Sequence, residues 1–186
     1  MLGLRKGATT VLPHDPQWES AARTAIDTLK TILGDAAVDI RHVGSTAIPS
    51  IHAKPVVDIA VGMRDVKSIE PLVGELERHG IFFRPYRRPE IHPDQLLFIM
   101  VDGSVAEDTR THNIHVLPYG GETWNNYIDF RDYLRANPDR AAEYDALKVA
   151  LSEAHPDDRI AYTAGKETLI DELLAEARAW RKAVTA

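Results

Sequence analysis

The stretch that decides the fold runs from Asp39 to Met63 and reads DIRHVGSTAIPSIHAKPVVDIAVGM. Residues 38–43 alternate apolar and polar side chains, as a half-buried strand does. Small polar residues at 44–46 end this alternation, and residues 55–61 form a second β-rich run with one carboxylate, Asp58, at its centre. Burial of a lone carboxylate is costly unless it meets a cation or hydrogen-bond donors. Asp58 is therefore expected to face a polar cleft beside the glycine–serine turn.

The rest of the chain predicts a mixed α/β core followed by helices. Apolar spacing and stop signals predict helices over residues 16–33, 66–79, 124–135, 138–153 and 160–182, and strands over 81–86, 95–101 and 109–117. The pattern changes near residue 120. We therefore expect an α/β core over residues 1–120 and a C-terminal helical part over residues 121–186, packed together as one compact domain.

Composition excludes several classes of function. The 186 residues carry a net charge of −6 and include no cysteine. General nucleic-acid binding needs a basic face, so it is not expected. Disulfides, zinc–thiolate sites and thiol nucleophiles are excluded, which suits the reducing cytoplasm. No apolar run approaches the roughly 20 residues that cross a bilayer. We expect a cytoplasmic protein without membrane contact; nothing in the sequence indicates its oligomeric state.

Residues 44–61, GSTAIPSIHAKPVVDIAV, resemble the signature of the nucleotidyltransferase superfamily, in which an Asp-centred strand follows a Gly-Ser pair after about a dozen residues. The whole chain is more specifically similar to the GrpB family, in the blocks HDPQW (14–18), THNIHV (111–116), FRDYLRANPDRAAEYDALK (130–148) and YTAGKETLI (162–170). The resemblance implies a nucleotidyltransferase-like mixed sheet flanked by helices. It also implies nucleotidyl transfer from a nucleoside triphosphate to a small acceptor, with Mg²⁺ or Mn²⁺.

The candidate site follows from these blocks. Asp58 is the expected metal ligand, because hard divalent cations prefer oxygen. Backbone amides and hydroxyls of a Gly-Ser turn bind phosphates, and lysines neutralise them. The candidate nucleotide-binding residues are Gly44, Ser45, Thr46, Lys54 and Lys166.

The second carboxylate of the superfamily pair is replaced by Ala60, on the same strand face as Asp58. His115, which the THNIHV block places where the superfamily has a third carboxylate, is the best substitute, as a metal ligand or general base. A hydrogen-bonded structural histidine is the alternative. Further candidates are Asn113, Arg131, Lys148 and the loop arginines 84, 87 and 88. His42 is expected at the same cleft mouth, and a solvent-facing strand residue is the favoured alternative. Tyr162 is a candidate stacking surface for a base, and a packing tyrosine is the favoured alternative.

Two functions remain open from the sequence. The first is a divergent metal-dependent nucleotidyltransferase, which the Asp kept within a β-run favours. The second is a catalytically weak or inactive nucleotide- or anion-binding accessory module, which Ala60 favours and which the occurrence of GrpB-like domains fused to dephospho-CoA kinase implies.

Overall fold

A mixed β-sheet forms the centre of the protein. The computed structural model describes all residues except 6, 86–93, 102–108 and 186. Within these residues the strand order is β1-β2-β5-β4-β3. The strands are β1 (Ala37–Val43), β2 (Val57–Met63), β3 (Ile81–Arg84), β4 (Leu96–Val101) and β5 (Arg110–Pro118). β2 and β5 pair in parallel and the other neighbours pair antiparallel, so the sheet is mixed, as predicted.

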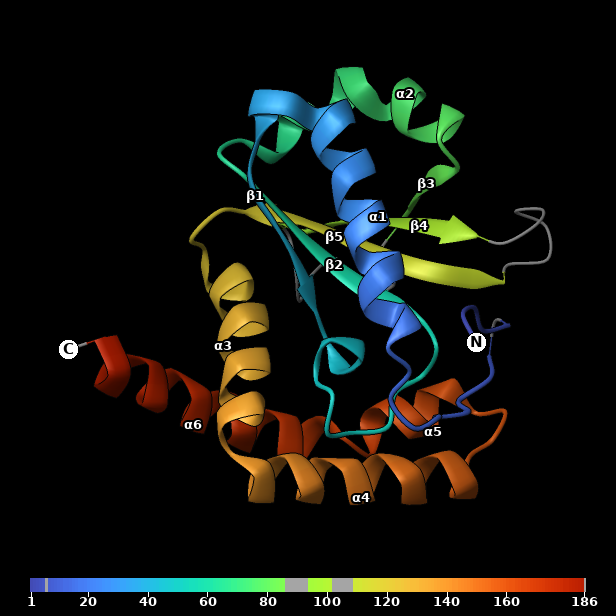
Figure 1. The fold of residues 1–186 in the computed structure, drawn as a ribbon, viewed down its shortest axis with the longest axis vertical. Helices are drawn as coiled ribbons and strands as arrows, with labels where there is room; N and C mark the ends of the chain where they lie inside the picture. The colour runs from blue at the N-terminus through green and yellow to red at the C-terminus, as the bar shows by residue number, and fades with distance from the viewer. Residues whose placement is uncertain (6, 86–93, 102–108, 186) are drawn as a thin grey trace.

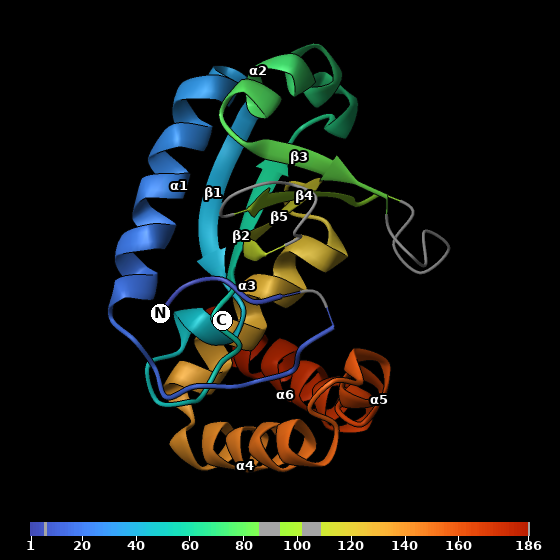
Figure 2. The ribbon, with the colours of Figure 1, turned by 90° about the vertical axis from the view of Figure 1, so that its right-hand side faces the viewer.

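Helix α1 (Gln17–Leu33) covers one face of the sheet (Figures 1 and 2). Its buried residues recur every three or four positions, which gives the helix one apolar stripe. The helix begins after Pro16, where the carboxylate of Asp15 accepts a 2.9 Å hydrogen bond from the Gln17 amide. The stripe packs on inward residues of β2 and β5 such as Ile59 and Ile114, forming the main core.

The helix predicted over residues 66–79 is divided. Residues Val66–Leu72 form a 3₁₀ helix, η3, and only Val73–Arg78 are α-helical, as α2. Pro71 lies within the 3₁₀ segment. Proline lacks the N–H that an α-helix needs and crowds the preceding turn, which explains why the α-helix begins after it.

The C-terminal helices lie on the opposite face and below one end of the sheet (Figures 1 and 2). They are α3 (Glu122–Ala136), α4 (Pro138–Ala154), α5 (Arg159–Ala164) and α6 (Glu167–Thr185). The single helix predicted over residues 160–182 is therefore wrong. The chain breaks at Gly165, where a β-carbon would lie 2.6 Å from a methyl group of Leu151. This close approach lets the α5–α6 junction pack against α4.

The segment between β1 and β2 joins the two parts of the chain. It contains a short 3₁₀ turn, η2 (Ser45–Ala47), followed by the buried residues Ile48 and Ile51. Both isoleucines pack in a second core with residues of α3, α4 and α6, including Tyr144 and Leu173. The glycine–serine turn is thereby fixed between the sheet and the C-terminal helices. The proposed boundary near residue 120 falls between β5 and α3 and stays a prediction.

No helix in the described part of the chain is both long and apolar enough to span a membrane.

Candidate functional site

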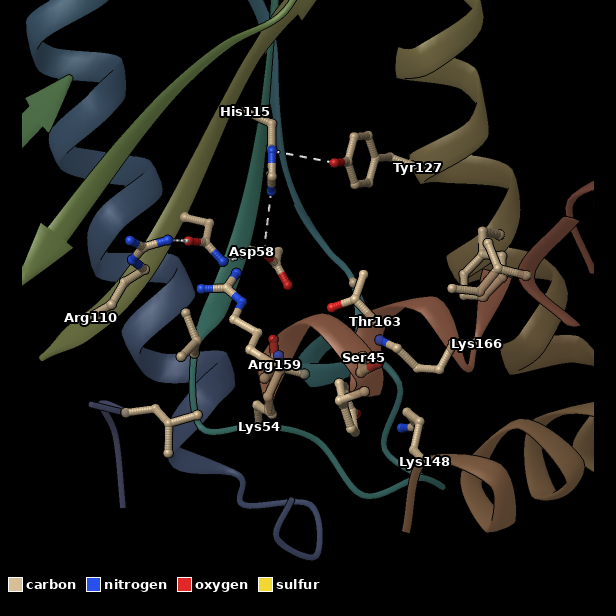
Figure 3. A pocket seen from close by; sticks show the side chains of 18 of the residues that line it. Ser45, Lys54, Asp58, Arg110, His115, Tyr127, Lys148, Arg159, Thr163 and Lys166 are labelled. Carbon is tan, nitrogen blue, oxygen red and sulfur yellow. Dashed lines mark hydrogen bonds and ion pairs between the residues drawn. The ribbon is translucent and has the colours of Figure 1, made fainter. Parts of the chain in front are cut away.

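Asp58 lies at the centre of the site, on β2. The parallel register places Asn113 beside Asp58 and His115 beside Ala60 on the neighbouring strand β5. Asn113 Nδ2 donates to Asp58 Oδ1 at 2.9 Å, and His115 Nε2 lies 3.2 Å from the same oxygen (Figure 3). The Asp58 side chain retains 27% of its exposure, so it faces an opening rather than sealed packing.

Asp58 is held in its anionic form. Burial raises the pKa of its carboxyl, but this is outweighed by the hydrogen bonds from His115 and Asn113 and by the charge of Lys54, so the pKa lies below its usual value. The site therefore contains a fixed negative charge at neutral pH.

Gly44 brings the turn against Asp58. Its backbone has φ 70° and ψ −172°, a conformation that is essentially restricted to glycine. A β-carbon at this position would lie 2.5 Å from Asp58 Oδ2, too close for any other residue. Ser45 follows directly and lines the same cavity as Asp58. The predicted proximity of the glycine–serine turn and the carboxylate is thus present in the structure.

The other ring nitrogen of His115 has two partners that the sequence reading missed. Gln95 Nε2 lies 2.9 Å from His115 Nδ1, and the Tyr127 hydroxyl lies 3.3 Å from it. Gln95 is only 6% exposed, and its Oε1 is buried without a hydrogen-bond partner. The imidazole is thus fixed between a carboxylate on one side and a polar pair on the other. In the sequence, Gln95 is the first residue of a predicted strand and Tyr127 has the pattern of an aromatic residue that packs in a helix seam. Their contact with His115 could therefore not be recognised without the order of the strands.

Asp58 opens into a cavity of about 560 Å³ between the sheet and the C-terminal helices. Its size is that of a typical small-molecule pocket. Its lining is strongly basic although the chain is acidic overall. The described lining contains one carboxylate, that of Asp58. Its basic residues are Arg5, Lys54, Arg110, Lys148, Arg159 and Lys166. A cavity of this charge favours a polyanionic ligand.

Two of the predicted lysines converge on one tyrosine. The ammonium groups of Lys54 and Lys166 lie 4.7 and 4.5 Å from the ring centroid of Tyr162. Burial lowers the pKa of Lys54 to about 7 and that of Lys166 to about 8, and the two groups are close enough for the charge of Lys166 to lower the pKa of Lys54 further. Tyr162 is 1% exposed and its ring packs against the lysines, as the favoured alternative of a packing tyrosine predicts, rather than lying open to stack on a base.

Lys148 also lines the cavity, but it has structural partners. Its ammonium lies 3.6 Å from the carboxylate of Asp145 and donates to the carbonyl of His52. It also lies over the ring of Tyr144, 4.8 Å from the centroid. Burial lowers its pKa to about 8. Lys148 therefore ties α4 to the segment between β1 and β2 as well as adding charge to the cavity.

Other candidates lie outside the cavity lining. His42 pairs in register with Ile59, so it faces the α1 side of the sheet, and its Nε2 is 2.9 Å from Thr46 Oγ1. The candidate His42 is therefore not part of the described cavity lining. Arg131 is bound to the His42 carbonyl at 2.9 Å and pairs with Asp132. Thr46 does line the cavity, although it is 1% exposed.

Ala60 occupies the position of the missing second carboxylate. It lies on the Asp58 face, as strand alternation predicts, but it is fully buried against Val43, Leu117 and Trp124. A helix side chain of α3 thus covers the position. Arg87 and Arg88 of the basic loop lie outside the described residues.

The donor set fits a divalent cation only in part. Within the described ranges, no group of three or more His, Asp or Glu side chains is placed to hold a metal ion. Asp58 and His115 offer two donors. Protein Mg²⁺ sites at phosphate substrates often use one or two carboxylates and complete the shell with phosphates and water. The residues present therefore fit a metal ion that arrives with a polyphosphate, rather than one bound by the protein alone.

Solved structures support the fold. The crystal structure of conserved protein GrpB from Enterococcus faecalis aligns with a TM-score of 0.80 and 29% identity, over 92% of this chain and 99% of that one. The structure of Cid1 in complex with its short product ApU aligns with a TM-score of 0.52 over 77% of this chain and 43% of that one. At 12% identity, this second likeness concerns the fold alone.

Sequence relatives fix the family. The chain is 37% identical over 176 residues to glutamate-rich protein GrpB of Alkalihalophilus pseudofirmus, covering 95% of this chain and 99% of the relative. It is 28% identical to a dephospho-CoA kinase of Mycolicibacterium paratuberculosis over 95% of this chain, which spans 47% of that relative's length. The family described as GrpB protein matches residues 8–176. By sequence and by fold, this chain belongs to the GrpB family.

Proposed function

We propose that the cavity binds a nucleoside triphosphate together with a divalent cation and transfers its nucleotidyl group to a small acceptor. The observation that carries the proposal is the approach of Asp58 to the Gly44–Ser45 turn at the mouth of a basic cavity. A carboxylate, a phosphate-binding turn and several cations have little reason to share one cavity unless its ligand is a metal-bound polyanion.

Each group has a role in this proposal. The turn and Lys166 hold the phosphate oxygens, with Lys54 nearby. Asp58 would hold the divalent cation together with phosphate oxygens, and the cation would supply charge neutralisation during the transfer. His115 would be either a second ligand of the cation or the base. The acceptor hydroxyl oxygen forms a bond to the α-phosphorus, the bond from that phosphorus to the bridging oxygen breaks, and pyrophosphate leaves.

The proton of the acceptor hydroxyl needs a base. His115 Nε2 faces Asp58 at 3.2 Å. Gln95 Nε2 donates to Nδ1, so the Nε2 proton of the free protein is donated to Asp58. A base role needs the other tautomer, with the proton on Nδ1 directed to the Tyr127 hydroxyl oxygen and a lone pair on Nε2. His115 then accepts the proton when it is not a metal ligand.

The second candidate is the accessory module, because the position of the second carboxylate holds an alanine. The position of the second carboxylate is Ala60, and it is sealed beneath Trp124. A module of this kind binds the same nucleotide without turnover. In both cases the cavity is a nucleotide site, and the two candidates differ only in whether pyrophosphate is released.

Calorimetry with a non-hydrolysable triphosphate analogue tests the binding step. We expect Mg²⁺ or Mn²⁺ to tighten binding to the wild-type protein at least tenfold. Asp58→Asn keeps the shape of the side chain but removes its charge, so it should abolish this metal dependence while metal-free binding stays equal or rises. Asp39→Asn, on the neighbouring strand β1, is the matched control and should bind as the wild type does.

Pyrophosphate release then separates the two candidates. With a panel of hydroxyl acceptors, the enzyme reading predicts release that His115→Gln slows by about 10²-fold or more, the usual contribution of a general base. Binding without release by the wild type would leave the accessory module. No binding of any triphosphate, with or without metal, would contradict both.

A further inference from the structure

The cavity of the candidate site has an apolar region that the proposed phosphate contacts leave unused. Phe130 of α3 and the α6 residues Ile170 and Leu174 line it. The two helices lie against each other (Figure 1), and the carboxylate of Asp129 on α3 accepts a 2.6 Å hydrogen bond from Arg181 Nε on α6. Aliphatic and aromatic walls do not stabilise a polyphosphate. This region therefore fits another part of the ligand, one that gains from burial of apolar surface.

Helix α6 places charged and apolar groups in sequence along the cavity. Lys166 directly precedes the helix, and its carbonyl accepts a 2.9 Å hydrogen bond from the Ile170 amide. Leu174 follows one turn later, and all three side chains line the cavity. At a rise of about 1.5 Å per residue, Ile170 lies about 6 Å and Leu174 about 12 Å from Lys166 along the axis. A ligand whose phosphates bind Lys166 would therefore have its organic part beside the two aliphatic side chains.

The ring of Phe130 is held next to the phosphate-binding turn. It makes a T-shaped contact with the buried ring of Tyr144, with centroids 5.5 Å apart and an interplanar angle of 88°. Burial raises the pKa of the Tyr144 hydroxyl, and the side chain of Ser45 opposes this rise, so the two hydroxyl groups lie close together. One side chain thus separates Phe130 from the turn. An aromatic ring is the kind of surface on which nucleobases stack.

Asn126 adds a polar group of fixed orientation to this region. It precedes Phe130 by one turn of α3 and lines the same cavity. Its Oδ1 accepts a 2.9 Å hydrogen bond from Arg178 Nε, and a guanidinium has donors only, so this contact identifies the oxygen of the amide. The group that Asn126 offers to a ligand is therefore the donor Nδ2. Because Arg178 lies one turn beyond Leu174, Asn126 meets the part of the ligand farthest from Lys166.

Resting on the proposed function, we infer that the nucleobase of the triphosphate stacks on Phe130 between α3 and α6, and that Asn126 selects a base with a carbonyl group at the edge opposite the sugar. Uracil O4 and guanine O6 are acceptors at this edge, whereas cytosine and adenine carry amino donors there. The Asn126 amide therefore favours uracil over cytosine and guanine over adenine. An amino group facing Nδ2 would place two donors together without an acceptor, which costs affinity.

Calorimetry on the full chain with Mg²⁺ tests the base subsite, with non-hydrolysable analogues of UTP, CTP, GTP and ATP, and tripolyphosphate as the ligand without a base. We expect at least one analogue to bind tenfold or more tightly than tripolyphosphate. Phe130→Leu should remove most of this gain while the affinity for tripolyphosphate, which also reports correct folding, changes less than twofold. Phe83→Leu is the matched control, an exposed aromatic residue of β3, and should change neither affinity.

The role of Asn126 is tested by the ratio of affinities within each ring size. We expect the wild type to bind uracil over cytosine, or guanine over adenine, by at least fivefold. Asn126→Asp keeps an acceptor for Arg178 and replaces Nδ2 by a second acceptor, so it should shift that ratio at least tenfold towards the amino base. Asn125→Asp adds the same charge to α3 outside the described cavity lining and should leave the ratio unchanged.

The outcomes separate the inference from the proposed function. If the analogues bind no more tightly than tripolyphosphate, the base subsite is wrong and the phosphate site stands. If the bases add affinity but the ratios are equal in the wild type and Asn126→Asp, the selection by Asn126 is wrong. If neither the analogues nor tripolyphosphate bind, the proposed function falls. Titration with uridine and guanosine then decides the subsite: binding that Phe130→Leu weakens supports it, and no binding overturns it.

Discussion

At the scale of single residues, the site depends on the contact between Gly44 and Asp58. Gly44 has a backbone conformation that other residues avoid, and it leaves no space for a β-carbon beside Asp58 Oδ2. The sequence pattern predicted that a turn and a carboxylate would meet, because strand alternation places Asp58 apart from its apolar neighbours. It did not indicate how closely they meet, since that depends on the register between β1 and β2.

Gly44→Ala should reduce the free energy of unfolding by about 1–3 kcal/mol, the cost of a residue forced into a glycine-only conformation. The contact with Asp58 should add to that cost and weaken metal-dependent nucleotide binding. Urea denaturation and calorimetry measure the two effects. Gly120→Ala is the matched control: its φ is 73°, but a β-carbon there meets nothing within 4 Å, so only stability should change. Equal nucleotide binding in both variants would contradict the proposed role of the turn.

Residue type also limited how well the sequence could predict which side chains surround Asp58 and His115. His115 was predicted to lie near Asp58, and it does, at 3.2 Å. Gln95 and Arg110 were not predicted, because glutamine and arginine occur on many strands without any role. Their importance here comes from the order β2-β5-β4, which brings β4 and the ends of β5 to the site. Strand order is a tertiary property that periodicity does not contain.

At the scale of elements, the junction of α5 and α6 positions the phosphate-side cation. Lys166 lies between the two helices, directly after Gly165, and its ammonium lies over Tyr162 of α5. The predicted single helix would have placed Lys166 at a regular helical position. The sequence signal for the break is one glycine, which costs little in a helix, and packing against Leu151 decides the outcome.

The lysines give nucleotide binding a pH dependence of predictable sign. Burial lowers the pKa of Lys166 and Lys148 to about 8, and a bound polyanion favours the protonated form of each. Above pH 8 the free protein loses protons that the complex must regain. Affinity for the analogue should therefore fall about tenfold or more between pH 7.5 and pH 9.5, a range in which triphosphate ionisation is nearly constant.

Calorimetry in buffers of different ionisation enthalpy should also detect proton uptake on binding. Lys166→Gln should reduce both the uptake and the pH dependence, whereas Lys67→Gln, an exposed lysine of η3, should leave both unchanged. An affinity that is constant over this range would show that the buried lysines do not hold the phosphates.

At the scale of the whole molecule, the charge of the cavity is opposite in sign to the net charge of the chain. The chain has a net charge of −6, yet six basic residues of its described part face one cavity. Composition argues against a general nucleic-acid surface, which stays a prediction, and it leaves a local anion site open. The fold class was predictable because most elements, though not the helices divided near Pro71 and Gly165, have a clear period and stop signal. The cavity was not, because its described walls come from the N-terminal segment, the sheet and the helices α3, α4, α5 and α6.

This arrangement makes the ligand a link between the two parts of the chain. The Gly44–Ser45 turn packs on the C-terminal helices through Ile48 and Ile51, while Asp58 belongs to the sheet. A nucleotide bound between them would stabilise both, by about 2.7 kcal/mol at one hundred times its dissociation constant.

The most direct measurement is a crystal soaked with Mn²⁺ and a non-hydrolysable nucleoside triphosphate. We predict anomalous scattering from Mn²⁺ beside the Asp58 carboxylate, with phosphate oxygens against Ser45 and Lys166. A nucleotide bound elsewhere on the surface, or phosphates in the cavity with no metal ion at Asp58, would contradict the proposed site.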